Sequence, residues 1–430
     1  MKKGRVIVIG GGPAGIEAAL TASSRFKEVF LVSEQPAGAW KMNDTAVWQS
    51  VLGKNRDRTP QELNEYAQSI HTKWMSEQID LLQHSGVRTK LGKVTFLSPY
   101  KINIENGEKN DTIEGDYFIL AVGSRPAFPQ PLHPYGDKVM SFHSLHQLKS
   151  WPESIVVVGD GPIGFEAVNL FSLAQVKVDW IVPEDGPSAR IFEEDLSDSL
   201  LSHYQKRGVH IFRGPVATSI KEERGRLHIS REDGSHVAAQ CAYIVPSFLS
   251  NLDRLTLANA EVDEHSIDAS TGQSNQSHIY VVGDADLSVA AVYAQAKARQ
   301  AVLHMDGKQE APLLLEDLPL SFHQWPEVAS MGLTKPGSSK LKVRTFSIKS
   351  RNYVHMVEEG SEGWVRVVYN EQGILFGASA VGEGAKGIIS ILAIPIKLKQ
   401  SVSNLQSLFA AHPSQNEMAA HIIRTIADEV

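Results

Sequence analysis

The chain contains the same glycine-rich segment twice. Residues 6–17 read VIVIGGGPAGIE and residues 155–166 read IVVVGDGPIGFE. In each copy an apolar run typical of a buried parallel strand leads into G-x-G-x-x-G and then into a helix-like stretch of small and apolar residues. The first glycine permits a tight turn, the second lets the backbone approach a pyrophosphate, and the third lets the helix pack on the strand. The sequence therefore predicts two dinucleotide-binding folds.

In such folds the anion lies at the N-terminus of the helix that follows the turn. The residues predicted to contact it are Gly10, Gly12, Pro13, Ala14 and Gly15 in the first copy, and Gly159, Gly161, Ile163 and Gly164 in the second. The alternative is a glycine turn with no ligand, and this alternative weighs more heavily on the second copy.

The two folds differ at the end of their second strand. In dinucleotide-binding folds an acid at the end of this strand binds the hydroxyl groups of the adenosine ribose. In the first fold Glu34 stands at this position, after the apolar residues 29–32. In the second fold the tip falls on Val182 or Pro183, with an acid only just beyond. No arginine stands there to meet a 2′-phosphate, so the sequence leans toward NADH over NADPH.

Further segments extend the pattern along the chain. Residues 118–126 form a strand-to-loop exit, and residues 279–284 form a buried strand that ends in Gly-Asp. Together with residues 318–334, 373–382 and the terminal motif HPSQNE at 412–417, they resemble the pyridine nucleotide-disulfide oxidoreductases, the family of dihydrolipoamide dehydrogenase, glutathione reductase and mercuric reductase. The resemblance spans almost the whole chain.

The resemblance implies an α/β chain with two Rossmann-like domains, one for FAD and one for NAD(P), and a C-terminal α+β dimerisation domain. The expected boundaries are 1–148 and 247–315 for the FAD-binding domain, 149–246 for the nicotinamide-nucleotide domain and 316–430 for the dimerisation domain. Asp284 is implied to bind the ribityl chain of FAD, with Gly123 and Gly283 beside it. The resemblance also implies a homodimer.

One family feature is missing. Members carry a Cys-x4-Cys disulfide just after the first ribose acid, whereas this chain has a single cysteine, Cys241. The corresponding segment, residues 36–55, places Lys41 and Ala46, or in another register Ala46 and Val51, at the cysteine positions. Neither register leaves a thiol, so electrons cannot pass to an internal disulfide. Trp40 and Trp48 either pack on the flavin or are ordinary core aromatics.

The resemblance also assigns catalytic candidates. His412 is implied to exchange protons at the partner subunit's flavin, with Glu417 orienting its ring; the alternative is a buried pair that holds the dimer. Glu166 is implied to lie beside the contact between nicotinamide and flavin, paired with Lys54 or Lys41 because a buried carboxylate needs compensation. The alternative for Glu166 is an acid that interacts with the helix dipole.

The composition of the chain argues against several classes of partner and site. The net charge of −7 argues against nucleic-acid or anionic-membrane partners. No apolar stretch reaches the roughly 20 residues of a membrane span. The single cysteine is typical of a reducing compartment, so we expect a cytoplasmic protein. The 16 histidines show no H-x-x-x-H spacing and no Cys-His cluster, so no metal site is predicted.

Two local patterns predict particular elements. Thr59-Pro60-Gln61-Glu62 forms a capping box with proline at the first helical position, which predicts a helix from there. The alternation in residues 364–369 predicts a strand of the last domain.

These observations favour an FAD-dependent NAD(P)H oxidoreductase that passes electrons from flavin directly to an acceptor other than an internal disulfide. The acceptor classes are a quinone, a nicotinamide nucleotide, another small molecule or a redox protein. Two alternatives stay open: a flavin-binding scaffold or sensor with little turnover, and an enzyme completed by a partner's thiols.

Overall fold

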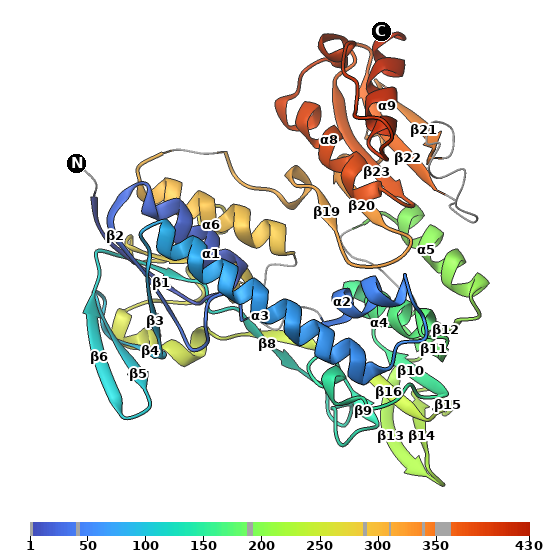
Figure 1. Cartoon of the computed structure of the whole chain (residues 1–430), viewed down its shortest axis with the longest axis horizontal. Coiled ribbons are helices and arrows are strands. Elements are labelled where there is room, and N and C mark those ends of the chain that lie inside the picture. The colour runs from blue at the N-terminus through green and yellow to red at the C-terminus, as the bar shows by residue number, and fades with distance from the viewer. Residues whose placement is uncertain are drawn as a thin grey trace. The chain divides into compact units, whose positions relative to one another are not determined.

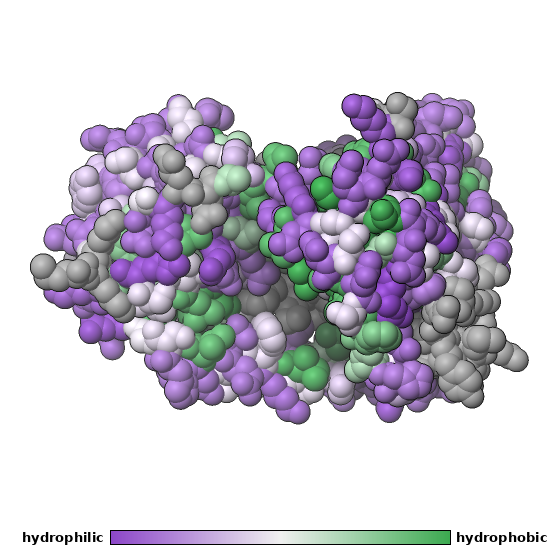
Figure 2. Space-filling model, turned by 90° about the horizontal axis from the view of Figure 1, so that it is seen from above, coloured by the Kyte–Doolittle hydropathy of each residue, from purple (hydrophilic) through white to green (hydrophobic). Residues whose placement is uncertain are grey.

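We analysed a computed structural model that describes residues 3–39, 44–186, 192–286, 290–308, 311–337, 340–348 and 363–430. The chain forms two compact units (Figure 1). The first unit comprises Met1–Met42, Glu65–Ala127 and Pro246–Leu314, and the second comprises Asn43–Asn64, Phe128–Val245 and Leu315–Val430. On the face seen in Figure 2, hydrophilic residues predominate and hydrophobic residues form smaller patches.

The first unit is built on a parallel five-stranded sheet in the order β18-β7-β1-β2-β3. Its strands are β1 (Lys3–Ile9), β2 (Phe26–Ser33), β3 (Arg88–Leu91), β7 (Tyr117–Leu120) and β18 (Ile279–Val281). Strands β1, β7 and β18 are largely apolar on both faces, as expected of a parallel sheet with both faces covered, whereas the edge strand β3 is polar and mostly exposed. On one face α1 (Pro13–Ser23) and α6 (Ala291–Met305) pack against each other and bury small side chains such as Ala18 and Ala298.

The opposite face of this sheet is covered by an antiparallel meander of β4 (Lys93–Ser98), β5 (Lys101–Asn106) and β6 (Lys109–Glu114). Phe96 and Ile102 of the meander share a core with Phe118 of the sheet. A two-stranded ribbon of β8 (Ser124–Ala127) and β17 (Ser247–Ser250) completes the unit.

The second unit contains another parallel five-stranded sheet, in the order β12-β11-β10-β16-β9. Its strands are β9 (Val139–Met140), β10 (Ser154–Val158), β11 (Lys177–Ile181), β12 (His210–Phe212) and β16 (Cys241–Ile244). Helix α4 (Gly161–Leu173) packs against β10 and β11 and contacts α2 (Asp44–Leu52) and α5 (Glu194–Lys206). The hairpin strands β13 (Ala217–Glu223), β14 (Arg226–Arg231) and β15 (His236–Ala239) share a core with this sheet.

The C-terminal part of the second unit is an antiparallel sheet in the order β19-β20-β23-β22-β21, with helices packed on it. Its elements are β19 (Leu320–Ser321), β20 (Val328–Gly332), β21 (Leu341–Ser347), β22 (Trp364–Asn370), β23 (Leu375–Val381), α8 (Ala385–Leu398) and α9 (Glu417–Ala427). Strand β22 contacts α5 through the ion pair of Arg366 with Asp195 and the hydrogen bond from Trp364 Nε1 to Ser199 Oγ. The predicted α/β class, with two Rossmann-type sheets and an α+β C-terminal part, is confirmed.

Both local predictions are also confirmed. Helix α3 (Pro60–His84) starts at the capping box: the Thr59 N–H donates to the Glu62 carboxylate at 2.9 Å, and the Glu62 N–H donates to Thr59 Oγ1 at 3.3 Å. The predicted strand at 364–369 lies within β22.

Candidate dinucleotide and redox sites

The first glycine turn joins the carboxyl end of β1 to the N-terminus of α1. A Cβ added to Gly10 would lie 2.1 Å from the Ala121 carbonyl oxygen, and one added to Gly15 would lie 1.9 Å from the Gly10 oxygen. A Cβ on Gly12, in contrast, would meet nothing within 4 Å. Helix α1 begins without a side-chain cap, so its first N–H groups are available to an anion. This open middle position is what a bound pyrophosphate requires.

The second glycine turn, between β10 and α4, has the same construction. A Cβ on Gly159 would lie 2.7 Å from Val245 Cβ and one on Gly164 would lie 3.0 Å from the Gly159 oxygen, while Gly161 faces open space within 4 Å. Helix α4 also begins without a side-chain cap. The residues of both turns therefore fit a dinucleotide on geometric grounds.

The acidic candidates of the first unit lie at strand ends. Glu34 directly follows β2 and is exposed. Asp284 lies in the 3-10 turn η4 (Gly283–Asp286), which follows β18. A Cβ on Gly283 would lie 2.8 Å from Ala14 Cβ, so this turn lies against the first turn of α1. The structure thus brings Asp284 and the first glycine turn together. Gly123 lies two residues beyond Ala121, whose oxygen contacts Gly10.

Turn η4 is held at Ala285 and Asp286, the two residues that follow Asp284. Ser250 Oγ of β17 donates to the Ala285 carbonyl oxygen at 2.6 Å, and Lys297 of α6 forms an ion pair with Asp286. Only 5% of the Lys297 side chain is exposed. Asp284 itself is reached by solvent, but surrounding protein atoms and the neighbouring charge of Asp286 raise its pKa. Sequence reasoning missed Lys297, since a lysine within a helix gives no signal of burial.

Glu166 is buried in α4 and lies in a polar cluster with α2. Its carboxylate accepts hydrogen bonds from Thr45 Oγ1 at 3.3 Å and from the His323 backbone N–H at 3.0 Å. The predicted partner Lys54 is exposed beyond the end of α2, and its side chain forms no ion pair within the described parts of the chain. The other predicted partner, Lys41, and the aromatic candidate Trp40 lie outside the described residues. Trp48 is fully buried, edge-to-face with Trp151.

The same cluster contains a histidine that the sequence did not single out. His323 Nε2 lies 3.4 Å from Ser50 Oγ. Burial, with a contribution from the positive charge of Lys386, lowers the pKa of His323 to about 4. Its ring is therefore neutral at physiological pH. The sequence offered no periodic or motif signal for it, because its partners come from segments far apart in the chain.

His412 and Glu417 form the predicted pair. His412 Nδ1 lies 3.1 Å from Glu417 Oε1, which also accepts a hydrogen bond from the Ser414 N–H at 2.9 Å. These two hydrogen bonds, the backbone one first, lower the pKa of Glu417. The His412 side chain is 72% exposed within the single chain, so it is available to an external group.

Cys241 lies in β16, in the core of the second unit. It is buried, and this burial, with the nearby charge of Asp137, raises the pKa of its thiol to about 11. A thiol with such a pKa is almost entirely protonated at neutral pH and is a poor redox nucleophile.

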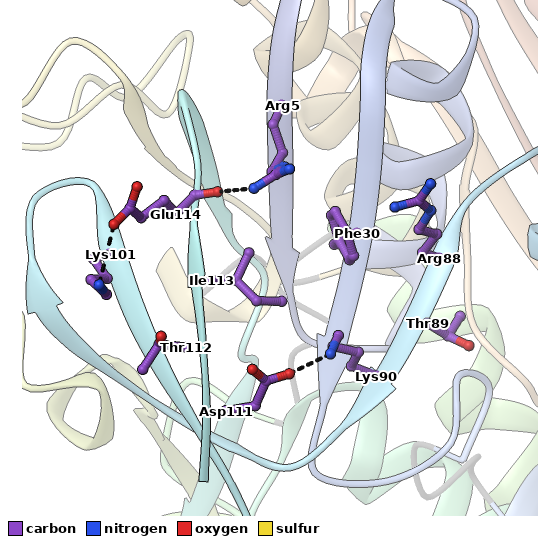
Figure 3. Close-up of a pocket in the computed structure, with 10 residues that line it drawn as sticks. All are labelled: Arg5, Phe30, Arg88, Thr89, Lys90, Lys101, Asp111, Thr112, Ile113 and Glu114. Carbon is purple, nitrogen blue, oxygen red and sulfur yellow. Dashed lines mark hydrogen bonds and ion pairs between the residues drawn. The ribbon is translucent and has the colours of Figure 1, made fainter.

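A surface pocket of about 680 Å³ lies between β1–β3 and the strands β5 and β6 (Figure 3). Its cations are each paired with an acid: Arg5 and Arg88 with Glu28, Lys90 with Asp111, and Lys101 with Glu114. None of the predicted site residues lines it. The pocket is therefore lined by ion-paired side chains around Phe30, and it is not the predicted cofactor site.

Within the described residues no group of three or more His, Cys, Asp or Glu side chains is arranged to hold a metal ion. Over the same part of the chain no helix is both long and apolar enough to cross a membrane.

Two open glycine turns at the carboxyl ends of parallel strands define a protein of the two-dinucleotide-fold class. Residues 4–301 match the pyridine nucleotide-disulphide oxidoreductase family, and residues 318–422 match the dimerisation domain of that family. The chain belongs to the pyridine nucleotide-disulphide oxidoreductase family, as predicted. Members of this family bind FAD and NAD(P).

Individual relatives align over most of this chain at low sequence identity. A soluble pyridine nucleotide transhydrogenase of Hamiltonella defensa is 26% identical and aligns over 90% of this chain and 89% of its own. A dihydrolipoyl dehydrogenase of Chlorobaculum parvum is 26% identical over 96% of this chain and 94% of its own. An NAD(P)H dehydrogenase (quinone) of Mycobacterium tuberculosis is 24% identical over 95% and 91%.

Solved structures share the fold. LpdA from Mycobacterium tuberculosis superposes with a TM-score of 0.89 at 20% identity, covering 98% of this chain and 99% of that one. The flavoprotein disulfide reductase RclA from Escherichia coli, as a Cu(II) complex, gives a TM-score of 0.84 at 17% identity, covering 99% and 100%.

Proposed function

We propose that this protein is an FAD-dependent NAD(P)H oxidoreductase that delivers electrons to an acceptor other than an internal disulfide. The proposal rests on one combined observation. The protein has two glycine turns whose middle glycine faces open space, as a dinucleotide site requires, but it has only one cysteine and so cannot form the family's redox disulfide. FAD, when bound, supplies the chemistry of accepting a hydride from NAD(P)H and releasing electrons one or two at a time.

In this proposal, different residues of the first unit bind different parts of FAD. Gly12 and the N-terminus of α1 hold the pyrophosphate, with Gly10, Pro13, Ala14 and Gly15 shaping the turn. Glu34 accepts hydrogen bonds from the adenosine ribose, and Asp284 from the ribityl chain, with Gly123 and Gly283 beside them. In the second unit Gly159, Gly161, Ile163 and Gly164 hold the nicotinamide nucleotide in the same way.

The acceptor lies outside the chain. With Cys241 buried and protonated, no thiol of this protein accepts electrons. The names of two relatives suggest acceptor classes to test: the mycobacterial relative is a quinone reductase, and the Hamiltonella relative transfers electrons between pyridine nucleotides. We assign His412 as the group that donates a proton to a two-electron acceptor, with Glu417 fixing its ring. Glu166 is assigned to the nicotinamide side, held by Thr45 and His323 rather than by a lysine.

The chain acts as a homodimer in this proposal, and residues 316–430 form the dimerisation domain beside the FAD domain (1–148 and 247–315) and the nicotinamide domain (149–246). Exposed apolar side chains in the last part of the chain support the assignment: Ile394 is 59%, Leu398 57% and Phe409 75% exposed. A cytoplasmic location follows from the cysteine usage.

The proposal is tested by cofactor content and by anaerobic titration. We expect the purified protein to contain about one FAD per chain, NADH or NADPH to bleach its flavin absorbance, and a quinone or a second nucleotide to restore it. Gly12→Val is the matched variant: Gly12 has φ −81°, and its Cβ would meet no protein atom, so the variant folds but its side chain fills the pyrophosphate position. Stoichiometric FAD in Gly12→Val would show that the site is misplaced. Flavin that resists both nucleotides would favour the scaffold alternative.

A further inference from the structure

We propose that Asp160 supplies the ribose-binding carboxylate of the second dinucleotide fold and thereby makes the enzyme prefer NADH to NADPH. The inference rests on the proposed function and adds to it the identity of the reducing nucleotide. Asp160 stands between the first two glycines of the second turn, where the first turn has Gly11.

The backbone register identifies the equivalent residues of the two folds. The Gly10 N–H donates to the Val32 oxygen at 2.8 Å, and the Gly159 N–H donates to the Ile181 oxygen at 3.0 Å. Val32 and Ile181 are therefore equivalent, and two residues further on Pro183 occupies the place of Glu34. The second fold thus lacks an acid at the strand tip where the first fold has one.

The side chain between the two glycines points to this tip in both folds. A Cβ on Gly11 would lie 3.1 Å from Ser33 Oγ and 3.1 Å from Ala37 Cα, both at the tip of β2. By the same register Ala37 corresponds to Gly186. Asp160 Oδ2 lies 3.2 Å from the position of a Cβ on Gly186. The carboxylate of Asp160 therefore lies at the tip of β11.

The carboxylate of Asp160 is not used as a helix cap. Asp160 is the N-cap residue of α4, yet its side chain makes no capping hydrogen bond, although aspartate is among the preferred N-cap residues for that purpose. The other acids of this tip point elsewhere or are exposed. Glu184 Oε2 lies 2.6 Å from the position of a Cβ on Gly214, beyond β12, and Asp185 is exposed.

A carboxylate at this place discriminates between the two nucleotides. It accepts hydrogen bonds from the 2′- and 3′-hydroxyl groups of the adenosine ribose of NADH, which is the role of the strand-tip acid in NAD-binding folds. In NADPH the 2′-hydroxyl is replaced by a phosphate, which has no proton to donate at neutral pH and carries the same sign of charge as the carboxylate. Asp160 therefore favours NADH by attraction and disfavours NADPH by repulsion.

The test is calorimetric titration of the FAD-loaded protein with NAD⁺, NADP⁺ and 2′-deoxy-NAD⁺, which requires no turnover. We expect the wild-type protein to bind NAD⁺ at least about tenfold more tightly than NADP⁺. Asp160→Asn keeps the size of the side chain and a favourable N-cap residue. It should weaken NAD⁺ about 10- to 100-fold, the usual loss for hydrogen bonds to a charged group, and leave NADP⁺ unchanged or tighter. The loss should be smaller for 2′-deoxy-NAD⁺.

Asp185→Asn is the matched control, because it removes the same charge from the neighbouring loop after β11 and should change NAD⁺ binding less than twofold. A wild-type preference for NADP⁺, an equal loss for both nucleotides in Asp160→Asn, or the same loss in the control would overturn the inference. If the wild-type protein binds NAD⁺ and Asp160→Asn changes nothing, the inference fails alone. If it binds neither nucleotide, the proposed function fails with it.

Discussion

Cys241 and His323 each give a prediction that a single substitution can test. Cys241 is the only thiol, and burial in β16 raises its pKa to about 11. We expect Cys241→Ser to leave FAD content and reduction by NADH unchanged within about twofold, because the thiol does no chemistry. Reduction of either protein should give no long-wavelength band of the kind expected when a thiolate lies against flavin. Appearance of that band in the wild type and its loss in Cys241→Ser would place the thiol at the flavin.

His323 makes a prediction for stability against pH. Its pKa in the folded protein is lowered to about 4 by burial, below the value of about 6.5 for an unfolded chain. Between these values the unfolded chain binds a proton that the folded protein does not, so stability falls as the pH is lowered from about 6.5 to about 4. The contribution is at most about 3.5 kcal/mol, since one pKa unit corresponds to about 1.4 kcal/mol.

The variant His323→Gln removes this titration and keeps a polar side chain within reach of Ser50. Thermal unfolding of both proteins from pH 8 to pH 4 measures the difference. The wild-type Tm should decline more steeply than that of the variant below about pH 6.5, and the two slopes should agree above it. Parallel curves throughout would mean that the ring is protonated in the folded protein.

At the scale of elements, turn η4 is fixed by contacts from β17 and α6 at Ala285 and Asp286, directly after Asp284. Lys297→Met removes a nearly buried ammonium group that forms an ion pair with Asp286, and the loss of one member of a buried ion pair typically costs several kcal/mol. We expect FAD to bind at least about tenfold more weakly as the turn loosens, measured by quenching of flavin fluorescence on titrating the apoprotein.

Two variants separate this effect from general damage. Arg299 lies on the same helix; its side chain is 56% exposed and its Nη1 lies 3.9 Å from Glu17 Oε1. The FAD affinity of Arg299→Met should therefore hardly differ from that of the wild type. Adding Asp286→Asn to Lys297→Met removes the negative charge that Lys297 balances and should recover part of the affinity. No recovery would assign Lys297 to packing of α6 alone.

The elements also show where sequence reasoning succeeds. Glycine spacing and apolar runs predicted both dinucleotide turns, and the Thr59 capping box predicted the start of α3, because these signals are local in the chain. The partner of Glu166 could not be predicted in this way. Thr45 and His323 come from segments far from Glu166 in sequence, and only tertiary packing brings them together. Likewise the sequence does not decide whether Val182 or Pro183 lies at the tip of β11, because only the hydrogen bond to Ile181 fixes the register.

At the scale of the whole molecule, the proposed reaction needs two chains. His412 is held by Glu417 but is 72% exposed in the single chain, which is the arrangement expected of a group that serves a site completed by a second subunit. Imidazole suits proton transfer there because its ordinary pKa lies close to neutrality. An acceptor that takes up protons with its electrons therefore depends on His412, and an acceptor that takes only electrons does not.

His412→Ala separates these two cases. Reduction of the bound FAD by NADH should stay nearly unchanged, while reoxidation by a quinone should slow about 10²–10⁴-fold, the usual contribution of a positioned acid or base. Stopped-flow absorbance times the two half-reactions separately, and ferricyanide serves as the one-electron acceptor that takes up no proton. Reoxidation by ferricyanide should be spared and the variant should still elute as a dimer. His412 forms a hydrogen bond with Glu417 within the single chain, so equal slowing with both acceptors, or a monomeric variant, would show that the pair holds the dimer instead of moving protons.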